Sequence, residues 1–180
     1  GHEEFAQVFF DNVRTPADSL VGGLNEGWTI AKALLGFERL GIGSPRRPPY
    51  AFTRLVKVAR SRGLTDDPAF ADRFAQLRLD LADLTSLYGR YVDQVRRGET
   101  LGPDVSILKI WSMELYQRIS ELLVEAAEEQ GAFEGDVDFD DDIVDVLSPF
   151  YMSRPGTIYG GSNEIQRNIV AKDVLRLPAR

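Results

Sequence analysis

Apolar residues recur along most of the chain at intervals of three and four, the period of an amphipathic α-helix. In the clearest stretch, 68–97, they form one narrow stripe: Phe70, Phe74, Leu77, Leu81, Leu84, Tyr88, Tyr91 and Val95. A second stripe, in a helix expected from about Pro103 to Gly131, contains Leu108, Trp111, Leu115, Ile119, Leu122 and Ala126. Stripes of this width are typical of helices that pack in a bundle.

Shorter helical patterns precede and follow these two. The first covers 27–42, and the prolines of Ser44–Pro49 should break it before another helix at about 50–61. The last helix begins after Tyr159–Gly161, with Ser162 or Asn163 as its cap. The whole pattern predicts an all-α fold, an antiparallel four-helix bundle.

The N-terminal part has a different pattern. Residues 5–14 are short, apolar and aromatic, which predicts one or two short strands. Because a lone strand is not stable in water, this segment indicates a piece of a larger fold. We therefore divide the chain into a strand and linker segment at 1–23 and a helical domain at 24–180.

Composition and charge exclude several classes of function. The chain has no cysteine and a single histidine, His2, which excludes disulfides, thiol nucleophiles and multi-histidine metal sites. The net charge of −7 argues against nucleic acid or an anionic membrane as the main partner. There is no apolar run of the roughly 20 residues that span a bilayer, nor a basic signal region. We expect a cytoplasmic protein.

The acidic connector at 132–147 has carboxylates at calcium-loop spacing. Aspartates at the first, third and fifth positions begin at Asp136. The sixth position should be glycine but is Asp141, and the twelfth should be glutamate but is Leu147. These departures favour a solvated acidic loop, and no metal site is expected.

Two other features carry candidate chemistry. Gly160 and Gly161 precede a helix, where small residues let a ligand approach the backbone and free amides can bind an anion. Taken alone, this pattern favours a plain glycine-rich turn over a ligand site. Glu38 falls four residues after Leu34 and three after Leu35, on a stripe expected to be buried. A buried carboxylate either pairs with an arginine or takes part in chemistry.

Three motifs occur in a fixed order along the chain. Phe9-Phe-Asp-Asn-Val-Arg-Thr-Pro16 is followed by Leu-Val-Gly and Glu-Gly-Trp, which ends at Trp28. Near the other end stands Ile158-Tyr-Gly-Gly-Ser-Asn-Glu-Ile-Gln-Arg-Asn-Ile-Val-Ala-Lys172, then Leu-Arg-Leu-Pro178. The order and spacing resemble the end of the middle β-domain and the C-terminal helical domain of flavin-dependent acyl-CoA dehydrogenases. The resemblance covers nearly all of this chain, but only the later part of a family member.

This resemblance implies a C-terminal four-helix bundle, FAD, and oxidation of an acyl-CoA thioester to the trans-2-enoyl-CoA. In most of the family the catalytic base directly follows the tyrosine of the signature, where this chain has Gly160. In a minority, isovaleryl-CoA dehydrogenases among them, the base lies on the first long helix in a motif of apolar residue, Glu and Arg, which residues 37–39 match. Glu38 is therefore the expected base, in a dry pocket that would raise its pKa. The amide of Gly160 would stabilise the enolate-like oxygen.

The remaining site residues follow from the same resemblance. Arg39, Tyr159 and Gly161 are assigned to the substrate, and Ser162 and Glu164 to FAD. The electron acceptor implied for the family is an electron-transfer flavoprotein or an equivalent protein.

Other parts of the chain match the family less well. Gln130 and Gly131 resemble the helix-end pair that contacts the FAD of a neighbouring subunit. The usual Arg-x-x-Phe-Gly after the first long helix, a contact to the FAD pyrophosphate, is replaced by Ala59-Arg-Ser-Arg-Gly63. The prolines from Pro45 on fall where the family has a continuous helix.

These departures leave a second interpretation open: a non-catalytic helical subunit for assembly within a heteromeric acyl-CoA dehydrogenase. In either case we expect the isolated chain to dehydrogenate poorly. Family members form dimers or dimers of dimers through this domain. The chain also has apolar residues outside its stripes, which predict at least a homodimer: Leu79, Leu87, Ile107, Ile110 and Leu123.

Overall fold

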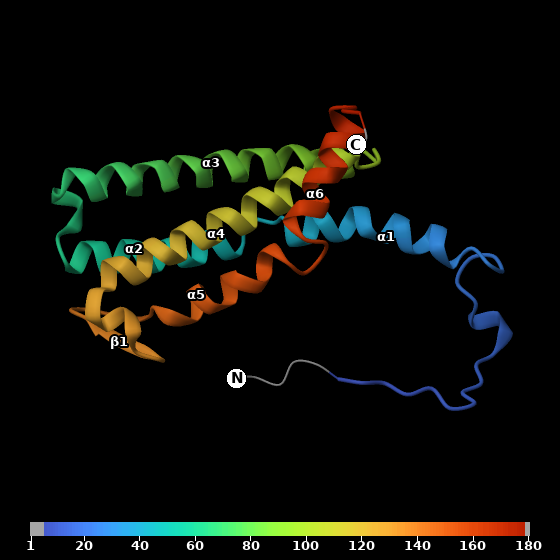
Figure 1. Cartoon of the computed structure of the whole chain (residues 1–180), viewed down its shortest axis with the longest axis horizontal. Helices are drawn as coiled ribbons and strands as arrows, with labels where there is room; N and C mark the ends of the chain where they lie inside the picture. Colours follow the sequence, from blue (N-terminus) through green and yellow to red (C-terminus); the bar gives the residue numbers. More distant parts are fainter. Residues whose placement is uncertain (1–5, 179–180) are drawn as a thin grey trace. The chain divides into compact units, whose positions relative to one another are not determined.

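The computed structural model describes residues 6–178, which form one unit up to Leu34 and a second from Leu35 onward. The chain is mostly helical, as the apolar period predicts (Figure 1). The α-helices are α1 (Gly27–Ile42), α2 (Arg47–Ser61), α3 (Pro68–Arg96), α4 (Ser106–Ala127), α5 (Leu147–Ser153) and α6 (Asn163–Ile169). Within the described chain no helix is both long and apolar enough to cross a membrane.

The N-terminal unit differs from its prediction. Before α1 it contains one 3-10 helix, Ala17–Ser19, and the described part of the expected strand, 6–14, has no regular structure. An extended segment becomes a strand only when a neighbour accepts and donates its backbone hydrogen bonds. Residue 5 lies outside the described residues.

The two helices of the first long stretch are separated by a short break. Helix α1 ends at Ile42, so the predicted break is present, but α2 begins at Arg47 rather than at about residue 50. Pro48 and Pro49 lie in the first turn of α2, where their missing amide donors break no helical hydrogen bond. Gly43 lies against α4: a Cβ there would come 2.6 Å from the Cβ of Leu108. This contact fixes the end of α1 on α4.

Helix α3 has the predicted stripe. Asp67 caps it by accepting hydrogen bonds from the amides of Ala69 and Phe70. Every second stripe position is buried and the positions between are half-buried; the buried ones are Phe70, Leu77, Leu84 and Tyr91.

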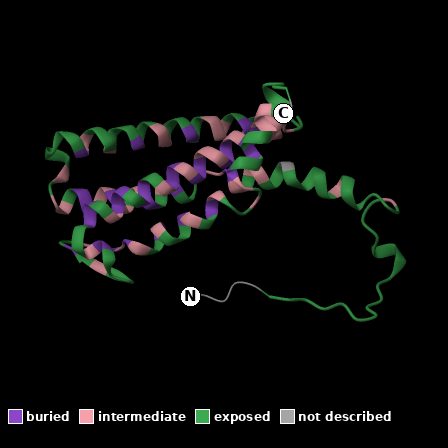
Figure 2. Cartoon of the chain, viewed as in Figure 1, coloured by how far each residue is buried: buried purple, intermediate pink, exposed green. Residues whose placement is uncertain are grey.

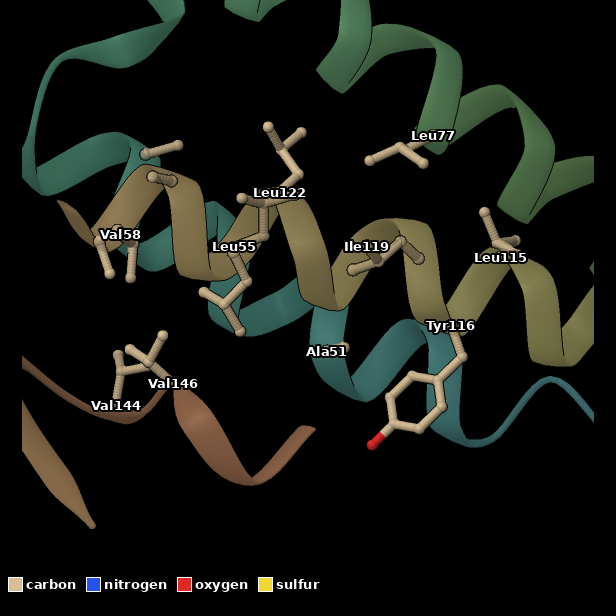
Figure 3. Close-up of a cluster of buried hydrophobic side chains, with 14 of the residues drawn as sticks. Ala51, Leu55, Val58, Leu77, Leu115, Tyr116, Ile119, Leu122, Val144 and Val146 are labelled. Carbon is tan, nitrogen blue, oxygen red and sulfur yellow. The ribbon is translucent and has the colours of Figure 1, made fainter. Parts of the chain in front are cut away.

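Helix α4 lies at the centre of the second unit and packs against α2, α3, α5 and α6. Its predicted stripe is buried apart from a half-buried Trp111, but burial extends well beyond that stripe (Figure 2). Leu123, which the sequence suggested as a surface residue for self-association, has no exposed surface. Figure 3 shows the resulting core, in which Leu55 of α2, Leu77 of α3 and Val144 face side chains of α4.

The acidic connector is a β-hairpin rather than a loop. Strands β1 (Asp136–Phe139) and β2 (Asp142–Asp145) pair antiparallel with Asp136 opposite Asp145. Apolar and acidic residues alternate along β1, which buries Phe139, whereas in β2 Val144 is buried and its neighbour Ile143 is exposed. The fold is therefore mostly helical with one small sheet, which lies near the C-terminal end of the chain rather than at its beginning.

Candidate functional site

The turn between Tyr159 and α6 has a backbone that only glycine adopts readily. Gly160 and Gly161 have φ angles of +64° and +82°, in the left-handed region. The side-chain amide of Gln166 donates hydrogen bonds to both glycine carbonyl oxygens, at 3.1 and 3.5 Å, and ties the turn to α6. The glycine amides find no acceptor among the described residues. They are therefore free to bind an oxygen atom of a ligand.

This turn lies against the end of α1. A Cβ built on Gly160 would collide with the Cδ1 atom of Ile42. Glu38 stands four residues before Ile42 on the same helix, so both side chains lie on one face, about 6 Å apart along the axis. The structure thus brings two predicted catalytic positions, Glu38 and Gly160, to the same end of α1.

The burial expected for Glu38 is wrong for this chain. Glu38 is exposed, as are Leu34, Leu35 and Phe37 before it, while Arg39 is half-buried. The helical period correctly predicts that these residues lie on a helix, but no described residue covers that part of α1. Any dry surroundings for Glu38 would have to come from another part of an enzyme.

A polar cluster that the sequence did not suggest fixes α6 on α4. Lys109 is fully buried, and its Nζ donates to Oδ1 of Asn163 at 2.8 Å. Asn163 in turn donates to Glu114 at 2.9 Å, and Glu114 also accepts a hydrogen bond from Arg167. Burial lowers the pKa of Lys109, whereas the nearby carboxylates of Glu164 and Glu114 raise it. Asn163 therefore serves as a tertiary contact, and Ser162 is the cap of α6.

The residues assigned to FAD near this turn are arranged to accept a polar ligand. The Ser162 hydroxyl accepts a hydrogen bond from the amide of Ile165. The pKa of Glu164 is lowered by hydrogen bonds from its own amide and from Ser162. Together with the free amides of the glycine pair, these groups concentrate hydrogen-bonding atoms at the start of α6.

Gln130 and Gly131 lie elsewhere. They follow the C-terminal end of α4, about 30 Å along the helix from Lys109. Gln130 accepts a hydrogen bond of 2.6 Å from Arg62, which also bonds to Glu128 and to the carbonyl oxygen of Ala127. The two sets of residues that the resemblance assigns to FAD are thus separate in this chain. Arg62 belongs to the segment that replaces the family's Arg-x-x-Phe-Gly, and no local pattern predicts its contact with Gln130.

Replacing Gly160 by alanine tests the geometry of the turn. We expect Gly160→Ala to lower the free energy of unfolding by about 1–2 kcal/mol, because alanine at a left-handed φ is strained and its Cβ must displace Ile42. Denaturant unfolding measures this. The control is Gly89→Ala in α3, where a Cβ meets nothing within 4 Å and the change should stabilise by about 0.5–1 kcal/mol. Equal effects at the two glycines would contradict the geometry described for the turn.

Comparison with known proteins gives matches to acyl-CoA dehydrogenases. Residues 25–175 match the protein-family model described as acyl-CoA dehydrogenase, C-terminal domain. The acyl-CoA dehydrogenase IpdE1 of Mycobacterium tuberculosis is 35% identical over 180 residues, which are 99% of this chain and 45% of that protein. IpdE1 of Mycolicibacterium smegmatis is 33% identical over 99% of this chain and 44% of its own length. The chain therefore spans less than half the length of these curated relatives.

Solved structures have the same fold. A structure described as the Tcur3481-Tcur3483 steroid ACAD superposes with a TM-score of 0.79 at 23% identity. The match covers 96% of this chain and 45% of the chain in that structure. Butyryl-CoA dehydrogenase from Megasphaera elsdenii gives a TM-score of 0.80 at 19% identity. The match covers 93% of this chain and 43% of the butyryl-CoA dehydrogenase chain.

Proposed function

Because the chain belongs to the acyl-CoA dehydrogenase family, we propose that it forms the helical catalytic part of an FAD-dependent enzyme that oxidises an acyl-CoA thioester to the trans-2-enoyl-CoA. The observation that carries this proposal is the contact of Gly160 with Ile42, one helical turn from Glu38. It gives one end of α1 both a carboxylate and a free backbone amide. These are the two groups that removal of a proton next to a thioester requires.

In the proposed reaction each group has one task. The carboxylate of Glu38 takes the α-proton of the acyl chain, and the bonding electrons move into a double bond between the α-carbon and the carbonyl carbon. The amide of Gly160 donates a hydrogen bond to the thioester oxygen as it gains negative charge. Arg39, Tyr159 and Gly161 are the proposed substrate contacts. FAD, when bound, would accept the β-hydrogen as hydride, and the electron pair of the enolate would then form the double bond between the α- and β-carbons.

The proposed FAD contacts divide between two places. Ser162 and Glu164 would bind the cofactor beside the glycine turn, where Ser162 and the free amides support polar contacts. Gln130 and Gly131 would contact the FAD of a neighbouring subunit, which agrees with their position about 30 Å along α4. This division requires an assembly of at least two subunits: a homodimer, a tetramer or a heteromer. Electrons would leave through an electron-transfer flavoprotein or an equivalent acceptor.

A second function, assembly without catalysis, is favoured by one observation. The break at Gly43–Arg46 interrupts the helix that carries Glu38, and the preceding part of α1 exposes large apolar side chains: Trp28, Leu34 and Phe37. Such a surface is typical of a region that another protein part covers. In that case the chain would act as a structural subunit of a heteromeric dehydrogenase.

Flavin content and thioester oxidation separate the two functions. We expect the enzyme that contains this segment to purify yellow and to lose its flavin absorbance when an acyl-CoA is added without oxygen. The 180-residue chain with added FAD should dehydrogenate poorly. A colourless enzyme that does not oxidise acyl-CoA would favour the assembly function instead.

A further inference from the structure

A pocket of about 610 Å³ lies where the break between α1 and α2 meets α4, α5 and the turn before α6. Its apolar lining includes Ile42, Met113 and Met152. The volume lies within the range of sites that enclose a small organic ligand. Segments distant in the sequence form it, so local patterns give no sign of it.

The polar side chains that distinguish this pocket are hydrogen-bond donors. They are the guanidinium groups of Arg46 and Arg47 and the hydroxyls of Ser44, Tyr50, Tyr116 and Tyr159. No carboxylate belongs to the lining, and no salt bridge among the described residues includes either arginine. The N-terminus of α2 adds positive potential at the same place. In a chain of net charge −7, this is a local concentration of positive charge without a counter-ion.

The hydroxyl of Tyr116 is the pocket's donor on α4. Only 2% of it is exposed, and its hydroxyl, which points away from α4 (Figure 3), has no hydrogen-bond partner among the described residues. Burial raises the pKa of Tyr116, so the hydroxyl stays protonated. Because Tyr116 lines the pocket, a bound ligand can supply the acceptor that this hydroxyl lacks.

Two of the other hydroxyls are oriented by arginines. Arg47 donates a hydrogen bond to the hydroxyl of Tyr159, and Arg54 donates one to that of Tyr50. Because each hydroxyl accepts from a guanidinium, its own proton is directed elsewhere. The hydroxyl of Tyr159 donates to the sulfur of Met113 at 3.9 Å, and sulfur is a weak acceptor. A ligand with a stronger acceptor can therefore take this proton.

Ile42 connects this pocket to the proposed reaction site. It lines the pocket, it contacts Gly160, and it follows Glu38 by one turn of α1. An acyl chain with its thioester at Glu38 and Gly160 would pass Ile42 and enter the pocket. We infer that the pocket binds the far end of the acyl group and that this end carries a carboxylate; the inference rests on the proposed function. A carboxylate matches both the array of donors and the two guanidinium groups.

Two thioesters of equal length test the inference. Suberoyl-CoA ends in a carboxylate where octanoyl-CoA ends in a methyl group. We expect the flavin-loaded enzyme that contains this chain to bind suberoyl-CoA about tenfold or more tightly in calorimetric titration, because hydrogen bonds between charged groups contribute at least this much. The ratio of kcat/KM for the two thioesters should favour suberoyl-CoA to the same extent.

The variants identify the groups responsible. Arg46→Met and Arg47→Met should each remove most of the preference, and Tyr116→Phe should reduce it a few-fold with little change of volume. Arg47 also positions the hydroxyl of Tyr159, so its replacement removes both a charge and a contact. The side chain of Arg46 makes no hydrogen bond in the described structure. Arg46→Met therefore tests the loss of charge alone. Arg96→Met on the surface of α3 is the control for loss of a positive charge and should keep the preference.

The outcomes distinguish this inference from the proposed function. Equal binding of the two thioesters, or a preference that both arginine variants retain, overturns the inference even if both thioesters are oxidised. A preference for suberoyl-CoA that Arg46→Met abolishes supports the pocket, even where neither thioester is oxidised and the proposed function fails.

Discussion

Replacement of Glu38 by glutamine is expected to reduce turnover by at least about 10²–10⁴-fold, while flavin binding is retained. Glutamine keeps the shape of the side chain but cannot accept the α-proton. Glu38 is exposed and makes no hydrogen bond within the described chain, so its replacement removes no internal contact. Single-turnover reduction of the flavin by acyl-CoA measures the loss, and the flavin absorbance of the purified variant measures cofactor binding.

The matched control is Glu26→Gln, at another carboxylate beside the start of α1. Glu26 accepts a hydrogen bond from the amide of Gly23 and precedes Glu38 by 12 residues in the sequence, outside the proposed site. Its replacement should leave the rate nearly unchanged. If Glu38→Gln retained a near wild-type rate, the base would lie elsewhere and the catalytic assignment would be wrong.

Replacement of Lys109 by alanine is expected to lower the free energy of unfolding by about 3–5 kcal/mol. The alanine variant loses the burial of the lysine stem, about 0.8 kcal/mol for each methylene, and leaves a cavity. It also leaves Oδ1 of Asn163 without its donor. Lys109→Met, which keeps a stem of similar length, should cost only about 1–2 kcal/mol. Denaturant unfolding of both variants gives the two values.

Lys57→Ala provides the control, because Lys57 has the same side chain in a half-exposed ion pair with Asp142. Its loss should cost less than about 1 kcal/mol. A similar cost for Lys109→Ala would show that Lys109 is not buried as described.

The stability should also depend on pH through Lys109. Its pKa is lower in the folded chain than the ordinary 10.5 of the unfolded chain. Between the lowered pKa and 10.5 the unfolded chain binds more protons, so stability rises with pH in that window. Lys109→Met removes this contribution to the slope.

The helices could be predicted from the sequence because local periodicity determines which side of each helix is apolar. The seam of α3 and the break before Arg47 are confirmed because both depend on neighbouring residues. The burial of Glu38 and the exposure of Leu123 were wrong for one shared reason. A helical period shows which side chains lie together, but not how many other elements cover them.

The same reason explains the residues that the sequence did not suggest. Lys109 lies outside the stripe of α4 and is buried because α4 is covered on more than one side. Tyr116 and Arg47 meet in one pocket only through the packing of α2 on α4. The hairpin had a visible alternation at Val137 and Phe139, but its many aspartates favoured a loop.

Those aspartates have a consequence for how copies of the chain meet. A two-stranded sheet has two open edges, and each edge offers unpaired backbone groups to a strand of another molecule. Six of the ten residues from Asp136 to Asp145 are aspartates, so a second hairpin that approached either edge would bring like charges together. The hairpin can thus cover the core with Phe139 and Val144 while its charge protects the protein against edge-to-edge aggregation.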